Sequence, residues 1–254
     1  MNISFIGAGN VAWHLAPAFE NVGCKVGEVY SRDFENAKKL TSYLFDAEPV
    51  SALDFSESRS RVFIVSVPDD VISQISDQLI VPEDALVVHT SGACSMNLLN
   101  KHNFRGVLYP LQTFTKGRKL DVSGIPFFLE AIDDDAYQVL KGFAQCLSNN
   151  LHMADKHQRL ALHTAAVFAC NFTNHFLSIS GGILDKTELP FEVLYPLVRE
   201  TVEKAFELGP DRAQTGPAVR KDVKTIQSHL DFLEDAPTVK EMYKILSKSI
   251  LKNG

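Results

Sequence analysis

Two polar side chains interrupt a long apolar stretch in the second half of the chain. His163 and Asn171 lie eight residues apart within residues 156–179, which read as one helix. Eight residues make about 2.2 turns of an α-helix, so both side chains project from roughly the same face. A histidine near neutral pH can give a proton to a developing alkoxide or amine. The spacing therefore favours His163 as a general acid and Asn171 as a group that orients the substrate or binds a ribose. A buried, hydrogen-bonded structural histidine is the alternative.

A glycine motif at the start of the chain predicts a phosphate-binding turn. Residues 3–6 read as a strand and lead into Gly7-Ala8-Gly9-Asn10-Val11-Ala12, a Gly-x-Gly-x-x-Ala pattern. Gly7 permits the tight turn, Gly9 lets backbone N–H groups approach a pyrophosphate, and Ala12 lets the next helix pack closely. The N-terminus of that helix presents free N–H groups and the positive end of its dipole. Residues 7–11 are therefore predicted to bind a dinucleotide, the alternative being a glycine turn between packed elements.

The residues after the second predicted strand indicate which dinucleotide binds. Residues 26–30 read as that strand, and Ser31, Arg32 and Asp33 follow it. In NAD-binding versions of the motif, an acid at the end of this strand binds the ribose hydroxyls. Here Arg32 can pair with a 2′-phosphate through its planar fork, and Ser31 can donate a hydrogen bond to it. Glu28 lies two residues before the strand ends, and Asp33 is predicted to cap the next helix. The pattern favours NADP over NAD, unless Arg32 is only a solvated surface arginine.

Three loops at the carboxyl ends of predicted strands carry further candidates, because ligands of such folds bind beyond those ends. The first loop, Ser66-Val67-Pro68, would border the adenosine and the nicotinamide ribose. The second, Thr90-Ser91-Gly92, would line the nicotinamide, with Ser91 positioning the reactants. The third begins at Tyr109, which offers a phenol. A turn with a local cap is the alternative for the second loop, and a core aromatic is the alternative for Tyr109.

A further pair lies late in the chain. Arg220 and Asp222 follow the Gly216-Pro217 turn. Arg220 could clamp a substrate carboxylate with Asp222 holding it in place, or the two could be a structural pair that caps a helix. The eight histidines are dispersed and lack the spacing of a metal site, so no metal is predicted.

Alternating strands and helices position the candidates of the first part of the chain. Strands are predicted at residues 3–6, 26–30, 62–67, 85–89, 106–109, 126–132 and 151–154, and helices at residues 11–22, 34–44, 69–79 and 133–147. Asp69 or Asp70 is predicted to cap the third helix. The continuous apolar run at 62–67 is typical of a parallel strand that is buried on both faces. The alternation predicts an α/β fold with a doubly wound, mostly parallel Rossmann sheet.

After residue 154 the pattern becomes all-α. Helices are predicted at residues 156–179, 191–208, 222–233 and 239–251, with a loop at 209–217. The predicted domains are a Rossmann NADP-binding domain at 1–154 and a helical substrate or dimerisation domain at 155–254. A mostly apolar helix needs cover on several sides, which favours a homodimer formed through the helical domain.

Composition restricts the partners. The chain has 254 residues, of which 45% are hydrophobic and 22% charged, and its net charge is −6 without a long basic run. These values argue against nucleic acid and anionic membrane surfaces. No signal-peptide pattern precedes the first strand, and the longest apolar run, residues 160–170, is too short to span a bilayer. The cysteines are interpreted as buried free thiols in a reducing cytoplasm: Cys24, Cys94, Cys146 and Cys170.

The motifs together resemble a known family. The segments that carry the resemblance are Gly7-Ala8-Gly9-Asn10-Val11, Val67-Pro68-Asp69, His89-Thr90-Ser91-Gly92, Tyr109-Pro110-Leu111-Gln112-Thr113-Phe114, residues 163–172 and residues 215–222. The layout is similar to the 6-phosphogluconate/β-hydroxyacid dehydrogenase and pyrroline-5-carboxylate reductase superfamily. It resembles in particular NADP oxidoreductases that join a Rossmann-like domain to a C-terminal helical domain of unknown function. The resemblance covers essentially the whole chain and implies its architecture better than its reaction.

One departure from that superfamily limits what is carried over. Many β-hydroxyacid dehydrogenases have a lysine four residues before the asparagine of this helix, where the present chain has Val167. Their lysine-based mechanism is therefore not expected here. The threonine-rich loop of pyrroline-5-carboxylate reductases also has no clear match.

Competing functions remain open at this stage. The first is an NADP-dependent oxidoreductase that transfers a hydride between NADP(H) and a small carbonyl or imine substrate in an interdomain cleft. In it His163 donates the proton, Asn171 and Ser91 position the reactants, and Arg220 holds an acidic group. The alternative is a non-catalytic NADP(H)-binding sensor or regulatory protein, which the missing lysine supports. A third hypothesis passes the hydride to a second cofactor such as a deazaflavin and needs a wide, apolar cleft beside the nicotinamide.

Overall fold

The chain forms two compact units, and the first of them is built on one sheet. The computed structural model describes residues 1–253, and the units are Met1–Cys170 and Asn171–Gly254. The strands are β1 (Asn2–Ile6), β2 (Lys25–Tyr30), β3 (Glu48–Val50), β4 (Val62–Val65), β5 (Leu86–His89), β6 (Arg105–Pro110), β7 (Phe127–Ala131) and β8 (Leu151–Met153).

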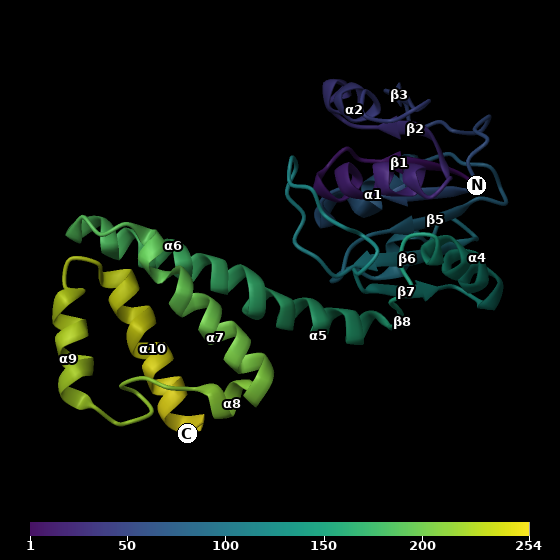
Figure 1. The fold of residues 1–254 in the computed structure, drawn as a ribbon. Coiled ribbons are helices and arrows are strands. Elements are labelled where there is room, and N and C mark those ends of the chain that lie inside the picture. Colours follow the sequence, from purple (N-terminus) through teal and green to yellow (C-terminus); the bar gives the residue numbers. More distant parts are fainter. Residues whose placement is uncertain (254) are drawn as a thin grey trace. The chain divides into compact units, whose positions relative to one another are not determined.

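The strand order makes the sheet doubly wound. The order is β3-β2-β1-β4-β5-β6-β7-β8, which Figure 1 shows from β3 at the top to β8 at the bottom of the unit. Strands β1 to β6 are parallel, β7 is antiparallel to β6, and β8 is parallel to β7. The order reverses between β1 and β4, so the loops after these two strands lie at the topological switch point. The predicted α/β class and mostly parallel sheet are confirmed.

Helices cover both faces of the sheet. The core on one face contains residues of α1 (Asn10–Asn21), α2 (Phe34–Thr41) and α4 (Asp134–Gln145). The core on the other face contains residues of α3 (Ile72–Gln78) and of the short 3₁₀ helix Met96–Leu99. Strand β4 supplies Val62 and Ile64 to the first core and Phe63 and Val65 to the second. This alternation explains why the strand reads as a continuous apolar run.

The helix that leaves the sheet is fixed at its start. Helix α5 (Lys156–Ala166) follows β8 and begins with a capping box between Asp155 and Gln158. Leu162 of this helix packs against a small core cluster that includes Val107 and Tyr109 of β6. Helix α5 therefore packs against strand β6 within the first unit.

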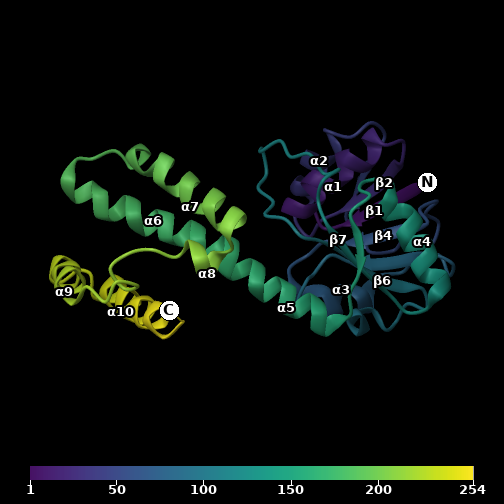
Figure 2. The same cartoon turned by 60° about the horizontal axis from the view of Figure 1, so that its bottom comes forward.

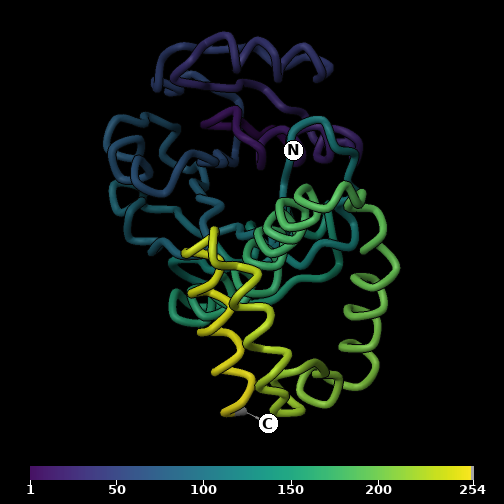
Figure 3. Tube along the Cα trace, turned by 90° about the vertical axis from the view of Figure 1, so that its left-hand side faces the viewer, coloured from purple at the N-terminus to yellow at the C-terminus, as the bar shows by residue number. Residues whose placement is uncertain are grey.

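The second unit is helical in its described residues. It contains α6 (Thr173–Leu184), the 3₁₀ helix Phe191–Leu194, α7 (Tyr195–Leu208), α8 (Pro210–Ala213), α9 (Val223–Phe232) and α10 (Pro237–Asn253). Helices α6 and α7 run in opposite directions (Figure 2), and α9 and α10 lie side by side, joined by a His229–Tyr243 contact (Figures 1 and 3). Among the described residues of this unit only Ala213, Ala218 and Leu233 are buried. The unit thus has little core of its own.

Several local predictions were wrong. The predicted helix at 156–179 is interrupted by a π-helix, Val167–Phe172, because hydrophobic periodicity cannot reveal the residue that a π turn adds. The loop predicted at 209–217 contains α8, and strand β3 was missed because it has three residues. The segment predicted as a capped helix at 69–79 is a 3₁₀ turn, Asp69–Val71, followed by α3, and neither has a side-chain cap.

The cysteine and boundary predictions have different outcomes. All four cysteines are free thiols, but only Cys24 is buried, whereas Cys146 and Cys170 are exposed. The boundary predicted near residue 154 falls just after β8, while the two compact units divide at residues 170 and 171. The position of the domain boundary therefore stays a prediction. Within the part of the chain that the structure describes, none of the helices has both the length and the hydropathy needed to cross a membrane.

Candidate functional site

The turn after β1 requires a glycine at position 7. Gly7 has a φ of +112° and donates its N–H to the carbonyl oxygen of Tyr30 at 2.8 Å. A Cβ on Gly7 would lie 2.4 Å from the carbonyl oxygen of Ser66, just beyond β4. Because both constraints come from the protein itself, Gly7 is needed for the turn whether or not a ligand is bound.

Gly9 differs, because the protein leaves room there for a side chain. Its φ of −82° and ψ of −172° suit any residue, and a Cβ would meet only the Ser66 carbonyl oxygen, at 3.7 Å. Gly9 is also the N-cap of α1, whose first turn has no acidic residue and no side-chain cap. Among the described residues, the first N–H groups of α1, on Asn10 and Val11, therefore have no side-chain acceptor. The space at Gly9 and the open first turn fit the pyrophosphate of a dinucleotide.

Near the end of β2, the side chain of Arg32 has no partner in the part of the chain that the structure describes, whereas the carboxylates of Glu28 and Asp33 already accept hydrogen bonds from the protein. Arg32 is exposed and forms no hydrogen bond or ion pair with any other described residue, and Ser31 beside it is half-buried. Asp33 accepts the N–H of Glu35 at 3.1 Å, which confirms the predicted cap of α2. The Glu28 carboxylate accepts hydrogen bonds from three serine hydroxyls, those of Ser4, Ser58 and Ser60. Glu28 is thus held by the protein, as expected for a residue that does not bind ribose.

The loops after β1 and β4 are joined at the switch point. The hydroxyl of buried Ser66 donates to the carbonyl oxygen of Gly7 at 3.3 Å. Val67 is half-buried and Pro68 is exposed, so these residues form the rim of the loop. The predicted cofactor residues of these two loops therefore lie together.

Ser91 orders the loop after β5. Its hydroxyl donates to a carboxylate oxygen of Asp69 at 2.9 Å and accepts the N–H groups of Ala93 and Cys94 at 3.2 and 3.0 Å. The N–H of Thr90 donates to the carbonyl oxygen of Val65 at 3.2 Å. The predicted cap at Asp69 was wrong because this carboxylate binds Ser91 instead. A role of Ser91 in positioning reactants stays a prediction.

A phenol and an imidazole meet beside this loop. The Tyr109 hydroxyl lies 3.2 Å from Nδ1 of His163. Burial, and secondly the charge of Asp69, raise the pKa of the Tyr109 phenol, so it keeps its proton at neutral pH. Among the described residues, Nε2 of His163 has no hydrogen-bond partner. A Cβ on Gly92 would lie 2.6 Å from the Tyr109 ring, so the glycine makes room for the phenol.

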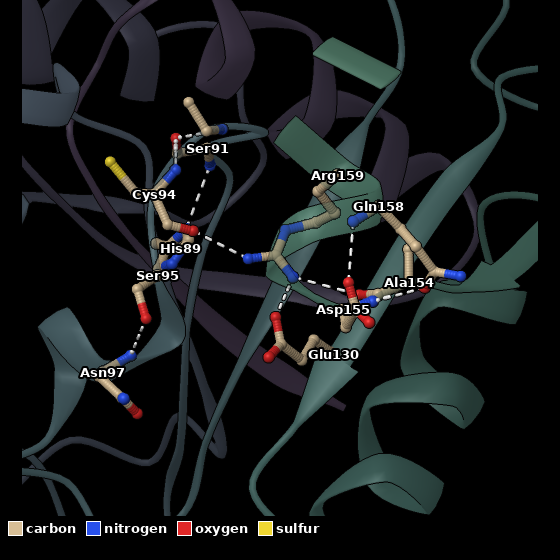
Figure 4. A network of polar contacts seen from close by, with 11 residues as sticks. His89, Ser91, Cys94, Ser95, Asn97, Glu130, Ala154, Asp155, Gln158 and Arg159 are labelled. Carbon is tan, nitrogen blue, oxygen red and sulfur yellow. Dashed lines mark hydrogen bonds and ion pairs between the residues drawn. The ribbon is translucent and has the colours of Figure 1, made fainter. Parts of the chain in front are cut away.

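A buried arginine ties helix α5 to the same loop (Figure 4). Arg159 is fully buried, pairs with Glu130 of β7, and donates to the carbonyl oxygens of Ala154 at 3.1 Å and Cys94 at 2.8 Å. Because Cys94 belongs to the loop that carries Ser91, Arg159 fixes that loop relative to α5, on which His163 lies. Charge-assisted hydrogen bonds of this kind are strong in a buried setting.

His89 is a neutral hydrogen-bond acceptor for the Ser91 loop. It is fully buried, and its Nδ1 accepts the N–H of Ser91 at 3.2 Å. Burial, and secondly the charge of Arg159, lower the pKa of His89 to about 4. The ring is therefore uncharged at neutral pH and acts as an acceptor for the loop.

Two predicted site residues belong to the second unit. Asn171 lies in the π-helix and is exposed, so the regular α-helical spacing to His163 on which its prediction depended is not present. Arg220 is also exposed and has no ion pair within the described residues. Asp222 caps α9 by accepting the N–H of Thr225 at 3.1 Å, and this hydrogen bond is the main cause of its lowered pKa. The roles of Asn171 and Arg220 stay predictions.

Asp69 and Arg159 were not recognised from the sequence as parts of this network. Asp69 follows Val67-Pro68 at the carboxyl end of a predicted strand. An acidic residue at the carboxyl ends of the strands could have indicated that it takes part in the site. Glu130 stands in an apolar segment and Arg159 immediately precedes the apolar run 160–170, and such a pair of opposite charges suggests a buried partnership.

These features define a Rossmann-like nucleotide-binding fold followed by a helical region. The family described as "Rossmann-like domain" matches residues 1–113, and the family described as "Domain of unknown function (DUF2520)" matches residues 125–250. A solved structure from Bacteroides fragilis, called a "putative NADP oxidoreductase", is 41% identical, with coverage of 99% of this chain and 98% of that chain and a TM-score of 0.90. The chain belongs to the same family as this protein, in which a Rossmann-like domain is joined to DUF2520.

More distant structures share the fold. A protein from Thermotoga maritima is 22% identical over 99% of this chain and 97% of its own, with a TM-score of 0.70. A reductive aminase from Aspergillus terreus, solved with NADPH and ethyl-5-oxohexanoate, is 11% identical over 100% of this chain and 94% of its own, with a TM-score of 0.74. A search of curated proteins found no match.

Proposed function

We propose that the protein is an NADP(H)-dependent oxidoreductase that acts on a small carbonyl or imine compound. The name of the 41% identical Bacteroides fragilis protein supports the cofactor. The Aspergillus terreus reductive aminase, which shares the fold, was solved with NADPH and a keto ester, and this supports the substrate class. NADP is favoured over NAD because Arg32 is available to a 2′-phosphate while Glu28 is held by serines.

The cofactor would be held by backbone and loop groups that meet at the switch point. The turn from Gly7 to Val11 would bind the pyrophosphate, and Ser31 with Arg32 would bind the 2′-phosphate. The loop from Ser66 to Pro68 and the loop from Thr90 to Gly92 would border the nucleosides. Bound NADPH would supply a hydride, so the protein must supply the proton that completes the reduction.

The hydrogen bond between Tyr109 and His163 carries this proposal. By engaging Nδ1 it fixes the ring and leaves Nε2 as the atom that gives up a proton. A phenol both donates and accepts, so Tyr109 keeps this bond whether the imidazole is charged or neutral. His163 would thus protonate the alkoxide or amine formed on the substrate. Asn171 and Arg220 are proposed to position the substrate, Arg220 by pairing with an acidic group.

Fluorescence titration with NADPH and NADH, followed by a screen of carbonyl and imine compounds, tests the proposal. Purified protein should bind NADPH more tightly than NADH and oxidise it with at least one compound. The His163→Ala variant should lose about 100-fold or more of kcat while its Kd for NADPH stays within about twofold. The matched control is His157→Ala, since His157 is an exposed histidine on the same helix.

The outcomes separate the two main functions. If the protein binds NADPH tightly but turns over no compound, the sensor function replaces the enzyme. If His163→Ala keeps its turnover, the proton donor is another group. If neither nucleotide binds, the assignment of the glycine turn is wrong.

We also propose a homodimer formed through the helical unit. Large apolar side chains of that unit are exposed in the single chain, including Leu197 at 63%, Phe206 at 85%, Val223 at 73% and Ile245 at 59%. Exposed apolar surface of this extent is typical of an interface. A reducing compartment such as the cytoplasm suits the four free cysteines.

A further inference from the structure

A long loop of the first unit reaches from β6 back to α1. We call residues 111–126, which join β6 to β7, the strap. In Figures 1 and 2 it is the teal segment that rises beside α1. Its tip is a turn in which the N–H of Arg118 donates to the carbonyl oxygen of Thr115 at 3.2 Å and Gly117 has a φ of +83°. The strap is therefore an ordered element beside the helix that begins at the glycine turn.

Three contacts dock the strap on the first half of α1. The Lys116 ammonium lies 5.3 Å from the centre of the Trp13 ring. The Phe114 ring lies 5.1 Å from the His14 ring, and Nε2 of His14 lies 3.0 Å from the carbonyl oxygen of Arg118. The basic tip of the strap is thus held next to the first turns of α1, where the phosphate-binding turn ends.

His14 bridges the first turn of α1 and the strap. Its Nδ1 lies 2.8 Å from the carbonyl oxygen of Asn10, and its Nε2 faces the carbonyl oxygen of Arg118. The charged groups beside this ring are Lys116 and Arg118 on the strap, and the first turn of α1 contributes no acidic residue.

The strap cations also lack a protein counter-charge. Lys116, Arg118 and Lys119 are exposed, and none of them forms an ion pair with another described residue. Positive charge gathers here although the chain as a whole carries a net charge of −6. Such a group next to an open helix N-terminus is complementary to phosphate oxygens.

We propose that the strap is the second half of the phosphate-binding site: Lys116, Arg118 and Lys119 bind phosphate oxygens of the dinucleotide, and His14 holds the strap on α1. This inference rests on the proposed binding of NADP(H). A bound phosphate supplies the negative charge that the strap cations lack in the free protein, so nucleotide affinity should fall as added salt screens this attraction.

Nucleotide affinity tests the role of the strap cations. Arg118→Ala and Lys116→Ala should each weaken NADPH binding by about three- to tenfold at low salt, with less effect at high salt. The matched control is Arg59→Ala, since Arg59 is exposed, unpaired among the described residues and precedes β4, at the amino ends of the parallel strands and away from the glycine turn. Equal weakening of NADPH and NADH would assign the strap to the pyrophosphate, and weakening of NADPH alone would assign it to the 2′-phosphate.

Limited trypsin digestion tests the docking by His14 without any measurement of activity. Trypsin cleaves after lysine and arginine, so cuts at residues 116, 118 and 119 report an undocked strap. NADPH should slow these cuts in the wild-type protein. His14→Phe keeps a ring against Phe114 but removes the hydrogen bond to the carbonyl oxygen of Arg118, so it should speed the cuts.

The results distinguish the inference from the function on which it rests. If the wild-type protein binds neither nucleotide, both are wrong. If it binds NADPH but the strap variants keep the wild-type Kd at low salt, only the inference is overturned. The same holds if NADPH gives residues 116–119 no protection from trypsin.

Discussion

Replacing Gly9 with alanine adds a methyl group where the protein leaves space. The backbone angles at Gly9 suit alanine, and the nearest atom to the added Cβ is 3.7 Å away. Restricting the unfolded chain should stabilise the fold by about 0.4–1 kcal/mol, whereas alanine is a poorer N-cap than glycine by several tenths of a kcal/mol. These effects oppose each other, so the free energy of unfolding should change by less than about 0.5 kcal/mol.

Replacing Gly7 should have the opposite pattern. Alanine at a φ of +112° is strained by about 1–3 kcal/mol. In addition, the Cβ would lie 2.4 Å from a backbone oxygen, which cannot move away as a flexible side chain could. A total loss of about 2–4 kcal/mol is expected, which for a chain of this size lowers Tm by about 5–15 °C.

Thermal unfolding and NADPH titration of both variants compare the two glycines. Gly9→Ala should unfold like the wild type but bind NADPH at least about tenfold more weakly, a loss of about 1.4 kcal/mol. Gly7→Ala should lose stability even without the nucleotide. A Gly9→Ala protein that binds NADPH as tightly as the wild type would refute the assignment of the glycine turn to the pyrophosphate. An unchanged Tm for Gly7→Ala would refute the steric argument.

Two further predictions concern stability and assembly. The pKa of His89 is lowered to about 4 in the folded protein. Between pH 6.5 and 4 this histidine is therefore protonated in the unfolded chain but not in the folded one, so the free energy of unfolding decreases as the pH falls. Urea denaturation should therefore show a loss of about 2 kcal/mol between about pH 7.5 and pH 5, which His89→Gln should largely remove; an unchanged pH dependence in that variant would show that other groups cause it. Sedimentation equilibrium should give a particle of twice the 28.2 kDa of one chain, and a single-chain mass at micromolar concentration would contradict the proposed homodimer.

The sheet could be predicted because its residues obey simple periodic rules. Val62 to Val65 form an apolar run, and the structure buries this strand between two cores. The glycine motif and the cap at Asp33 were also recognisable, since each depends on neighbours within a few residues.

The interactions that bring the loops together could not be predicted in the same way. The bonds from Ser91 to Asp69 and from Tyr109 to His163 join residues that are 22 and 54 positions apart. Neither spacing has a periodic signature, because the contacts depend on how strands and α5 pack. The π-helix escaped prediction for a related reason: one added residue per turn changes the phase of a helix without changing its composition.

The reversal of strand direction at β7 has a consequence for how this protein can evolve. Because β7 and β8 run against the other strands, α5 starts beside the sheet, and Arg159 and His163 are in place before the chain enters the second unit at residue 171. The glycine turn, the Ser91 loop and the Tyr109–His163 pair are therefore inherited as one contiguous piece of chain. Mutations and exchanges after residue 170 therefore change none of the residues that form these contacts.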